Sequence, residues 1–129
     1  METMGRRSRR LWAVLAALSG GISVAAGAFA VHGLKVRSPE AAALFETAAH
    51  YQVVHALAMI GVLALIRTME GSARLALGAF IAGTGLFSGS LYAYALSFWH
   101  PLVFLTPLGG LAFLVGWGAF ALAAWRRLD

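Results

Sequence analysis

The feature that most constrains the fold is a series of long apolar stretches that carry almost no charge. The first, from Leu11 to Val31, contains no Asp, Glu, Lys or Arg, and about 20 such residues suffice to cross a bilayer as a helix. The whole chain is 60% hydrophobic and only 12% charged, far from the composition of a soluble domain. Its 129 residues therefore predict an all-α membrane protein with about four spans.

We predict an antiparallel four-helix transmembrane bundle. Residues 1–10 form a basic N-terminus, and residues 11–127 form one domain. The predicted spans cover residues 11–31, 48–66, 75–98 and 106–125. The connection between the third and fourth spans has no formal charge, so we expect a tight loop at the membrane surface.

The second helix has a clear predicted start. Ser38, Pro39 and Glu40 combine an N-cap residue, a proline at the first helical position and an acid in the first turn. A helix from Pro39 to Ile66 would be about 42 Å long, which exceeds the roughly 30 Å hydrocarbon core. We therefore expect a short interfacial helix before the second span.

The first stretch has a second interpretation as a secretory signal. Arginines precede it, and Ala28, Phe29 and Ala30 resemble a cleavage site, while residues 8–12 (SRRLW) are similar to a twin-arginine signal. A signal core usually has about 7 to 15 apolar residues. Because this stretch is longer, we favour a retained first helix, and N-terminal sequencing would test it.

The basic residues favour a membrane surface over nucleic acid as partner. Six of the ten flank apolar segments at the termini, namely Arg6, Arg7, Arg9, Arg10, Arg126 and Arg127, where they act as topology signals and contact anionic lipids. In the predicted bundle Arg67 and Arg74 lie on the same side of the membrane as these terminal arginines. Only Lys35 and Arg37 lie on the opposite side. Both termini are therefore predicted to be cytoplasmic. The chain has no cysteine, which excludes disulfides and thiolate chemistry.

Residues 45–57 (FETAAHYQVVHAL) place several polar groups in an otherwise apolar segment. Counted from Ile66, His55 lies about 16 Å deep and Glu46 about 30 Å, at the far boundary. All members of the candidate polar cluster fall in the extracytoplasmic half: His32, Glu46, His50, Tyr51, Gln52, His55, Ser88, Ser90 and Tyr92.

Each polar group has a functional and a structural interpretation. A histidine near the midplane marks a functional site or one helix-to-helix hydrogen bond, and we expect Ser88 or Tyr92 to be the partner of His55. Gly85 and Gly89, four residues apart, are predicted to pack the second and third helices together.

Glu46 and the histidines allow further arrangements. Glu46 and His50 lie one turn apart and form either a proton or cation relay or an interfacial salt bridge. His50 and His55 are about 140° apart around a helix, which disfavours a shared metal. Haem ligation by one of them with His32 is a further alternative. The sequence contains no catalytic motif, so no enzyme, metal site or cofactor is expected.

Several motifs resemble a known family. They are residues 27–34 (GAFAVHGL), 45–57, 86–92 (LFSGSLY), 106–110 (TPLGG) and 116–117 (GW). Over roughly Gly20 to Trp117 the chain is similar to the small membrane-protein family of unknown function, domain of unknown function 423, which includes vertebrate transmembrane protein 256 and many bacterial relatives. Ala30 stands where the family often has glycine. The resemblance implies a multi-pass inner-membrane protein in bacteria and brings no activity or catalytic residue.

Three functional classes follow. The first is a structural, assembly, lipid-binding or partner-binding membrane protein, favoured by small size and glycine-rich helices. The second is a component of a small permease or a cation or proton pathway, which would need an oligomer. The third is an intramembrane haem or redox protein. The expected partners are the lipid bilayer and a homo-oligomer or larger membrane complex, and no nucleic acid.

Overall fold

The computed structural model describes residues 2–128, with side chains from residue 5 onward. In chain order its elements are α1 (Glu2–Phe29), η1 (Ala30–Leu34), α2 (Pro39–Leu65), α3 (Gly71–Gly83), η2 (Thr84–Ser88), α4 (Gly89–Ser97), η3 (His100–Phe104) and α5 (Leu105–Arg127). The segments η1 and η2 are π-helical turns within longer helices, and η3 is a 3₁₀ turn.

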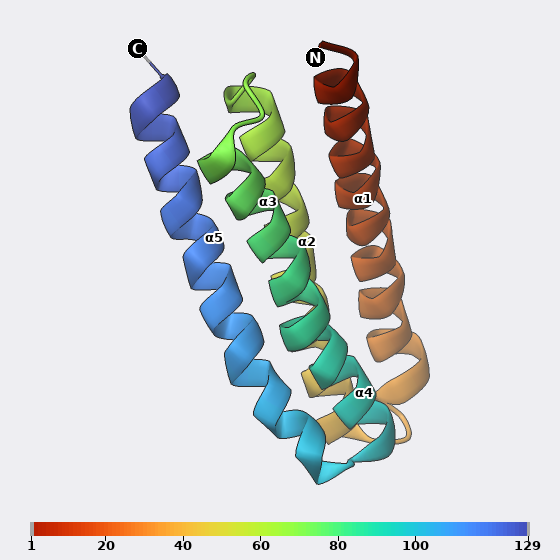
Figure 1. Cartoon of the computed structure of the whole chain (residues 1–129). Coiled ribbons are helices and arrows are strands. Elements are labelled where there is room, and N and C mark those ends of the chain that lie inside the picture. The colour runs from red at the N-terminus through yellow and green to blue at the C-terminus, as the bar shows by residue number, and fades with distance from the viewer. Residues whose placement is uncertain (1, 129) are drawn as a thin grey trace.

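Four continuous helical segments are long and apolar enough to cross a membrane. They are Gly5–Leu34, Pro39–Leu65, Gly71–Ser97 and His100–Arg127. They alternate in direction, and both chain ends lie at the same end of the bundle, here named the terminal end (Figure 1). The predicted antiparallel four-helix transmembrane bundle is confirmed.

The second helix begins as its sequence predicts. Pro39 is its first residue, and the Ser38 hydroxyl accepts a hydrogen bond from the Ala41 N–H at 3.1 Å. The helix then runs for 27 residues without a break, so the separate interfacial helix that we predicted is absent and that prediction is wrong. Ala42 and Phe45 in its first turns are buried in one cluster with residues of η1 and α4, which keeps this segment in line with the rest of α2.

The other connections are tight. The break after α2 is short, and the third helical segment begins at Gly71 rather than at the predicted Leu75. At the opposite end Phe98 terminates α4 in the left-handed region, with φ 51°, and its N–H donates to the Tyr94 carbonyl at 2.7 Å. This conformation is unusual for a bulky residue, and it reverses the chain within the few residues before η3.

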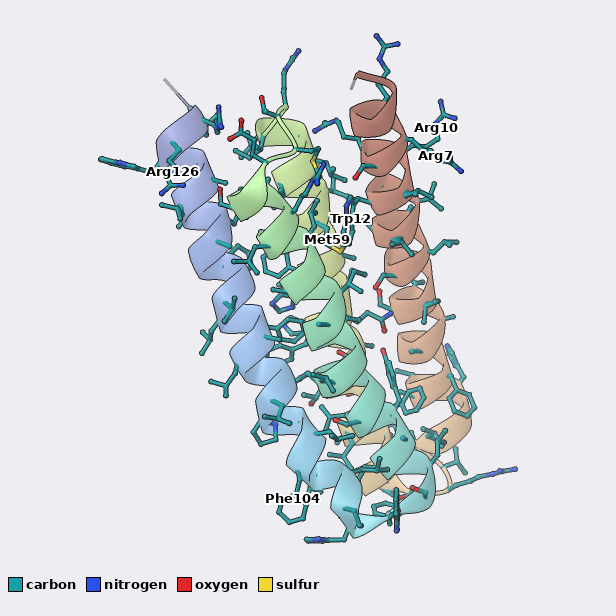
Figure 2. All side chains as sticks on the ribbon, viewed as in Figure 1. Arg7, Arg10, Trp12, Met59, Phe104 and Arg126 are labelled. Carbon is teal, nitrogen blue, oxygen red and sulfur yellow. The ribbon has the colours of Figure 1, made fainter. Side chains whose placement is uncertain are left out.

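The four helical segments pack side by side as an open bundle. α1 packs along α2, α2 along α3 and α4, and α5 along α3 and η2. The backbones of α2 and α5 approach each other closely at few points, and these two helices meet mainly through aromatic side chains. α1 and α5 therefore form opposite edges (Figure 1). Trp12 of α1 and Met59 of α2 lie between the first two helices, and Arg7, Arg10 and Arg126 mark the terminal end (Figure 2). This order leaves a cavity between α2 and α5.

Two glycines allow the third and fourth segments to approach closely. A Cβ atom on Gly109 of α5 would lie 2.7 Å from the Cα of Phe87, and one on Gly83 would collide with the ring of Phe113. Backbone and aromatic rings thus occupy the space of the missing side chains.

The glycines that we predicted at a helix contact behave differently. Gly85 is exposed, and a Cβ added there would meet nothing within 4 Å. A Cβ on Gly89 would meet only the Thr84 carbonyl of its own helical segment, at 3.9 Å. The prediction for Gly85 is wrong, and Gly89 makes no close approach to another helix. The second and third segments nevertheless pack together, as expected.

Candidate functional site

The predicted polar cluster is divided between the interior of the bundle and its surface. The buried members are Gln52, His55, Ser88 and Ser90, with Tyr92 partly buried. The exposed members are His32, Glu46, His50 and Tyr51. Each residue turns the helix by about 100°, so neighbours on α2 point to different sides. The nine residues therefore do not form one site.

A hydrogen-bonded chain crosses three helices in the interior. The Tyr92 hydroxyl of α4 donates to Gln52 Oε1 at 2.7 Å, and Gln52 Nε2 donates to the Ser19 hydroxyl of α1 at 3.2 Å. The sequence patterns did not single out Ser19, although a hydroxyl deep in an apolar span is a signal for such a bond. These three side chains satisfy one another and connect α1, α2 and α4.

The two serines of the third segment have partners other than histidine. The Ser88 hydroxyl donates to the Ala48 carbonyl of α2 at 2.7 Å. The Ser90 hydroxyl lies 2.6 Å from the Thr106 hydroxyl of α5. The bonds of Ser88 and Tyr92 to α2 agree with the expected packing of the second and third segments, whereas Ser90 joins the third segment to α5. None of these bonds reaches His55.

His55 is hydrogen-bonded to Trp117 of α5, so the prediction of Ser88 or Tyr92 as its partner is wrong. Its Nδ1–H donates to the Tyr51 carbonyl at 2.6 Å, and its Nε2 accepts from the Trp117 indole N–H at 3.1 Å. A carbonyl only accepts and an indole only donates, so these contacts fit the neutral imidazole. Residues 116–117 stand out as a motif, but their spacing gave no hint of this partner.

Aromatic rings enclose the same histidine. Its ring is stacked on that of Phe113, with centroids 3.5 Å apart and planes 7° apart, and Phe80 lies at 5.5 Å. His55 is only 4% exposed. Haem ligation through His55 would require breaking the Trp117 bond or the Tyr51 bond, because both ring nitrogens are engaged.

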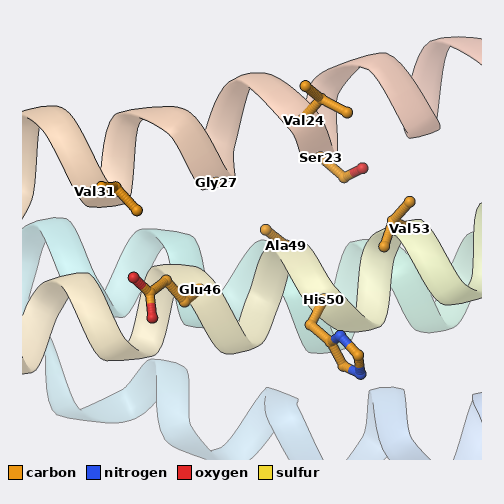
Figure 3. A pocket seen from close by; sticks show the side chains of 8 residues that line it. All are labelled: Ser23, Val24, Gly27, Val31, Glu46, Ala49, His50 and Val53. Carbon is orange, nitrogen blue, oxygen red and sulfur yellow. The ribbon is translucent and has the colours of Figure 1, made fainter.

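Glu46 and His50 border a shallow cavity of about 360 Å³ between α1 and α2, together with Ser23, Val24, Gly27, Val31, Ala49 and Val53. Figure 3 shows the carboxylate and the imidazole pointing apart along α2. Among the described residues neither side chain has a partner within ion-pair distance. The predicted salt bridge between them is therefore not formed, and the alternative of a proton or cation relay stays a prediction.

His32 lies exposed on η1, whereas His55 is buried on α2. Within the part of the chain that the structure describes, no three His, Asp or Glu side chains converge as a metal site requires.

A second cavity, of about 420 Å³, lies between α2 and α5 and is here named the α2–α5 groove. It is lined by His50, Tyr51, Val54, His55, Phe87, Gly110, Phe113, Leu114 and Trp117. Its walls are mostly aromatic, and its outer rim includes Leu114, which is 68% exposed. The Tyr51 hydroxyl and the His50 imidazole make no hydrogen bond with any described residue. The groove thus combines an apolar body with two polar groups that lack partners.

Comparison with known proteins supports the family resemblance. The model of a family described as "Protein of unknown function (DUF423)" matches residues 26–110. The UPF0382 membrane protein of Haemophilus influenzae is 39% identical over 113 residues, which cover 87% of this chain and 91% of that protein. The UPF0382 inner membrane protein YgdD of Escherichia coli strain K12 is 39% identical over 119 residues, with 91% of each chain covered.

More distant relatives extend the similarity. The UPF0382 membrane protein YwdK of Bacillus subtilis strain 168 is 32% identical over 122 residues, which cover 92% of this chain and 99% of that protein. No solved structure matches the chain. From the family match, these relatives and the four membrane-crossing helices, we conclude that the chain belongs to the DUF423 family and is a multi-pass inner membrane protein.

Proposed function

We propose that this protein binds a membrane-dissolved amphiphile, a lipid or lipid-like molecule, in the α2–α5 groove. The observation that carries this proposal is the pair of polar groups, His50 and Tyr51, which face the groove without a partner among the described residues. Polar groups exposed to hydrocarbon are costly unless they find hydrogen bonds. A bound molecule that supplies those bonds would remove the cost.

The shape of the groove fits such a ligand. Its volume of about 420 Å³ lies within the roughly 300 to 1,000 Å³ of small-molecule pockets. His50 precedes His55 by five residues on α2, so it lies about 7.5 Å nearer to the end of the bundle at η1 than His55 and its partner Trp117. A ligand with its polar end at His50 and its apolar end at Trp117 would have the orientation of a membrane lipid.

The other two functional classes have less support. A conducting pathway needs polar groups along one cavity, whereas Gln52 and Tyr92 bond each other in the interior and His50 faces outward. A haem or redox site would use His55, whose nitrogens both have partners. Binding is the class that leaves these interior bonds intact.

Filling the groove tests the proposal. Gly110 lines it, and a Cβ there meets nothing within 4 Å, so Gly110→Leu directs added volume into the groove from a position where the first side-chain atom has room. Gly118→Leu is the matched control, since Gly118 is also unobstructed on α5 but does not line the groove. Each variant is purified in mild detergent, and its co-purified lipids and small molecules are identified by mass spectrometry.

We expect Gly110→Leu alone to lose a molecule that the unmodified chain and Gly118→Leu both retain. Equal retention by all three proteins would overturn the proposal. The same measurement reports co-purified proteins and thereby tests the predicted larger membrane complex, and the mass of the intact particle tests the predicted homo-oligomer.

We further propose that both termini face the cytoplasm. The support is the excess of arginine at the terminal end, with only Lys35 and Arg37 at the other. Because the chain has no cysteine, a single introduced thiol reports its own location. An impermeant maleimide applied to spheroplasts should label Val36→Cys and not Thr68→Cys. The reverse pattern would show that both termini lie outside the cytoplasm and would contradict the proposal.

A further inference from the structure

The cavity between α1 and α2, here named the α1–α2 cavity, contains an acid without a cation beside it. Among the described residues that line it are Glu46 and His50, and no Lys or Arg. Glu46 forms no ion pair or hydrogen bond with any described residue. The hydroxyl of Ser23, which also lines the cavity, donates to the Gly20 carbonyl of its own helix at 2.6 Å. The carboxylate is therefore open to a positively charged group from outside the chain.

Glu46 lies at the level of lipid headgroups. Counted back from Leu65 at the end of α2, it is about 28 Å along the helix, close to the roughly 30 Å thickness of the hydrocarbon core. His50 lies about 6 Å nearer the middle of the membrane. Both side chains are exposed, so a headgroup at this surface is able to contact both.

His50 connects the carboxylate with the α2–α5 groove. Its imidazole points away from α1 (Figure 3) and lines the groove as well as the α1–α2 cavity. Residues one helical turn apart are neighbours, with about 5 to 6 Å between their Cβ atoms. A neutral imidazole offers an N–H donor, and a carboxylate only accepts. A donor and an acceptor of hydrogen bonds thus lie next to each other at the outer end of the groove.

We propose that the ligand of the α2–α5 groove is an aminophospholipid, whose headgroup carries a phosphate and a primary ammonium group. This inference rests on the proposed function, because the apolar chains occupy the groove. The ammonium donates to the Glu46 carboxylate, and a phosphate oxygen accepts from the His50 imidazole. An ethanolamine headgroup joins the two charges through a short linker, which matches side chains one turn apart.

The same arrangement disfavours a headgroup that is only anionic. Such a headgroup would bring a negative charge beside Glu46, and no described Lys or Arg lines either cavity to compensate it. The site needs only that the η1 end of the bundle lies at a membrane surface, so it holds for either orientation of the chain.

The test compares two acids of equal charge on the same helix. Glu46 lines the α1–α2 cavity, whereas Glu40 is exposed in the first turn of α2 and lines neither cavity. Native mass spectrometry of the full chain in detergent measures binding of phosphatidylethanolamine and phosphatidylglycerol. We expect the unmodified chain to prefer phosphatidylethanolamine, and Glu46→Gln to weaken its binding about fivefold, the upper value for an exposed ion pair. Glu40→Gln should retain the preference.

An equal loss in the two variants would indicate diffuse attraction and overturn the site, as would an unmodified chain without any preference. Phosphatidylcholine carries a cation that has no N–H, so it should bind more weakly than phosphatidylethanolamine. Equal binding of these two lipids would contradict a hydrogen bond from the ammonium to Glu46. Excess free ethanolamine should not displace the lipid, and displacement would assign the site to a soluble amine.

Gly110→Leu separates this inference from the groove proposal. Because it fills the groove, it should weaken binding of all these lipids alike. If it does so while Glu46→Gln leaves the headgroup preference unchanged, the headgroup assignment fails and the groove stands. Unchanged lipid binding in Gly110→Leu would instead refute the groove, and a preference that still depends on Glu46 would then assign the lipid to the α1–α2 cavity.

Discussion

His50 and His55 lie five residues apart on α2 and have opposite environments. His55 is 4% exposed, stacked on Phe113 and bonded at both ring nitrogens. His50 is exposed at the mouth of the α2–α5 groove, with no hydrogen bond to a described residue. The same residue type therefore stabilises the bundle in one place and is available to a ligand in the other.

The adjacent glycines of α5 repeat this contrast. Gly109 lies against the backbone of Phe87, whereas Gly110 faces open space in the groove. One step along a helix turns the side-chain direction by about 100°, which moves a residue from the closed contact to the open groove. This closed side and open side are expected to respond differently to substitution.

The largest expected difference is between the two glycines. Gly109→Ala places a methyl group 2.7 Å from the Phe87 Cα, and because backbone cannot rotate away, we expect destabilisation at the upper end of about 1 to 3 kcal/mol. Gly110→Ala should be neutral or slightly stabilising. Thermal unfolding in detergent compares them, and equal midpoints would mean that α5 does not pack closely on η2.

The next largest effect concerns the bond of the buried histidine. Trp117→Phe keeps an aromatic ring but removes the N–H that His55 accepts, and we expect a loss of about 1 to 2 kcal/mol. Trp125→Phe is the control, because Trp125 is 88% exposed. Unfolding measurements that place both variants at wild-type stability would show that His55 does not depend on this bond.

A smaller effect is expected on the open side, in binding rather than stability. Tyr51→Phe removes only a hydroxyl that has no described partner, so stability should change by less than about 0.5 kcal/mol. Retention of the co-purified amphiphile should fall by roughly twofold to tenfold, the value of one hydrogen bond. Tyr94→Phe, outside the groove, is the control for the lipid measurement.

The smallest effect is expected at Gly85. Because a side chain there meets open space, Gly85→Leu should leave the bundle intact and stabilise the helix by at most about 1 kcal/mol. A clear loss of stability in detergent would show that Gly85 packs against another helix of the chain and would contradict its exposed position.

Several elements could be predicted because they depend on local properties of the chain. The length of each apolar stretch predicted the four helices, and the Ser38 cap with Pro39 predicted the start of α2. The expected depth of Tyr92 agrees with its bond to Gln52 on the neighbouring helix. The interfacial helix failed because Phe45 and its neighbours pack against η1 and α4, a contact that helix length alone does not reveal.

The sequence by itself determined that this protein crosses the membrane four times and which residues share a depth. Depth follows from counting about 1.5 Å per residue along a helix. Only the tertiary structure decided that His55 pairs with Trp117, 62 residues away, that Gly109 and not Gly85 lies in a contact, and that Ser19 closes the polar chain. These depend on how each helix is rotated about its own axis against its neighbour, and side-chain packing between helices sets that rotation.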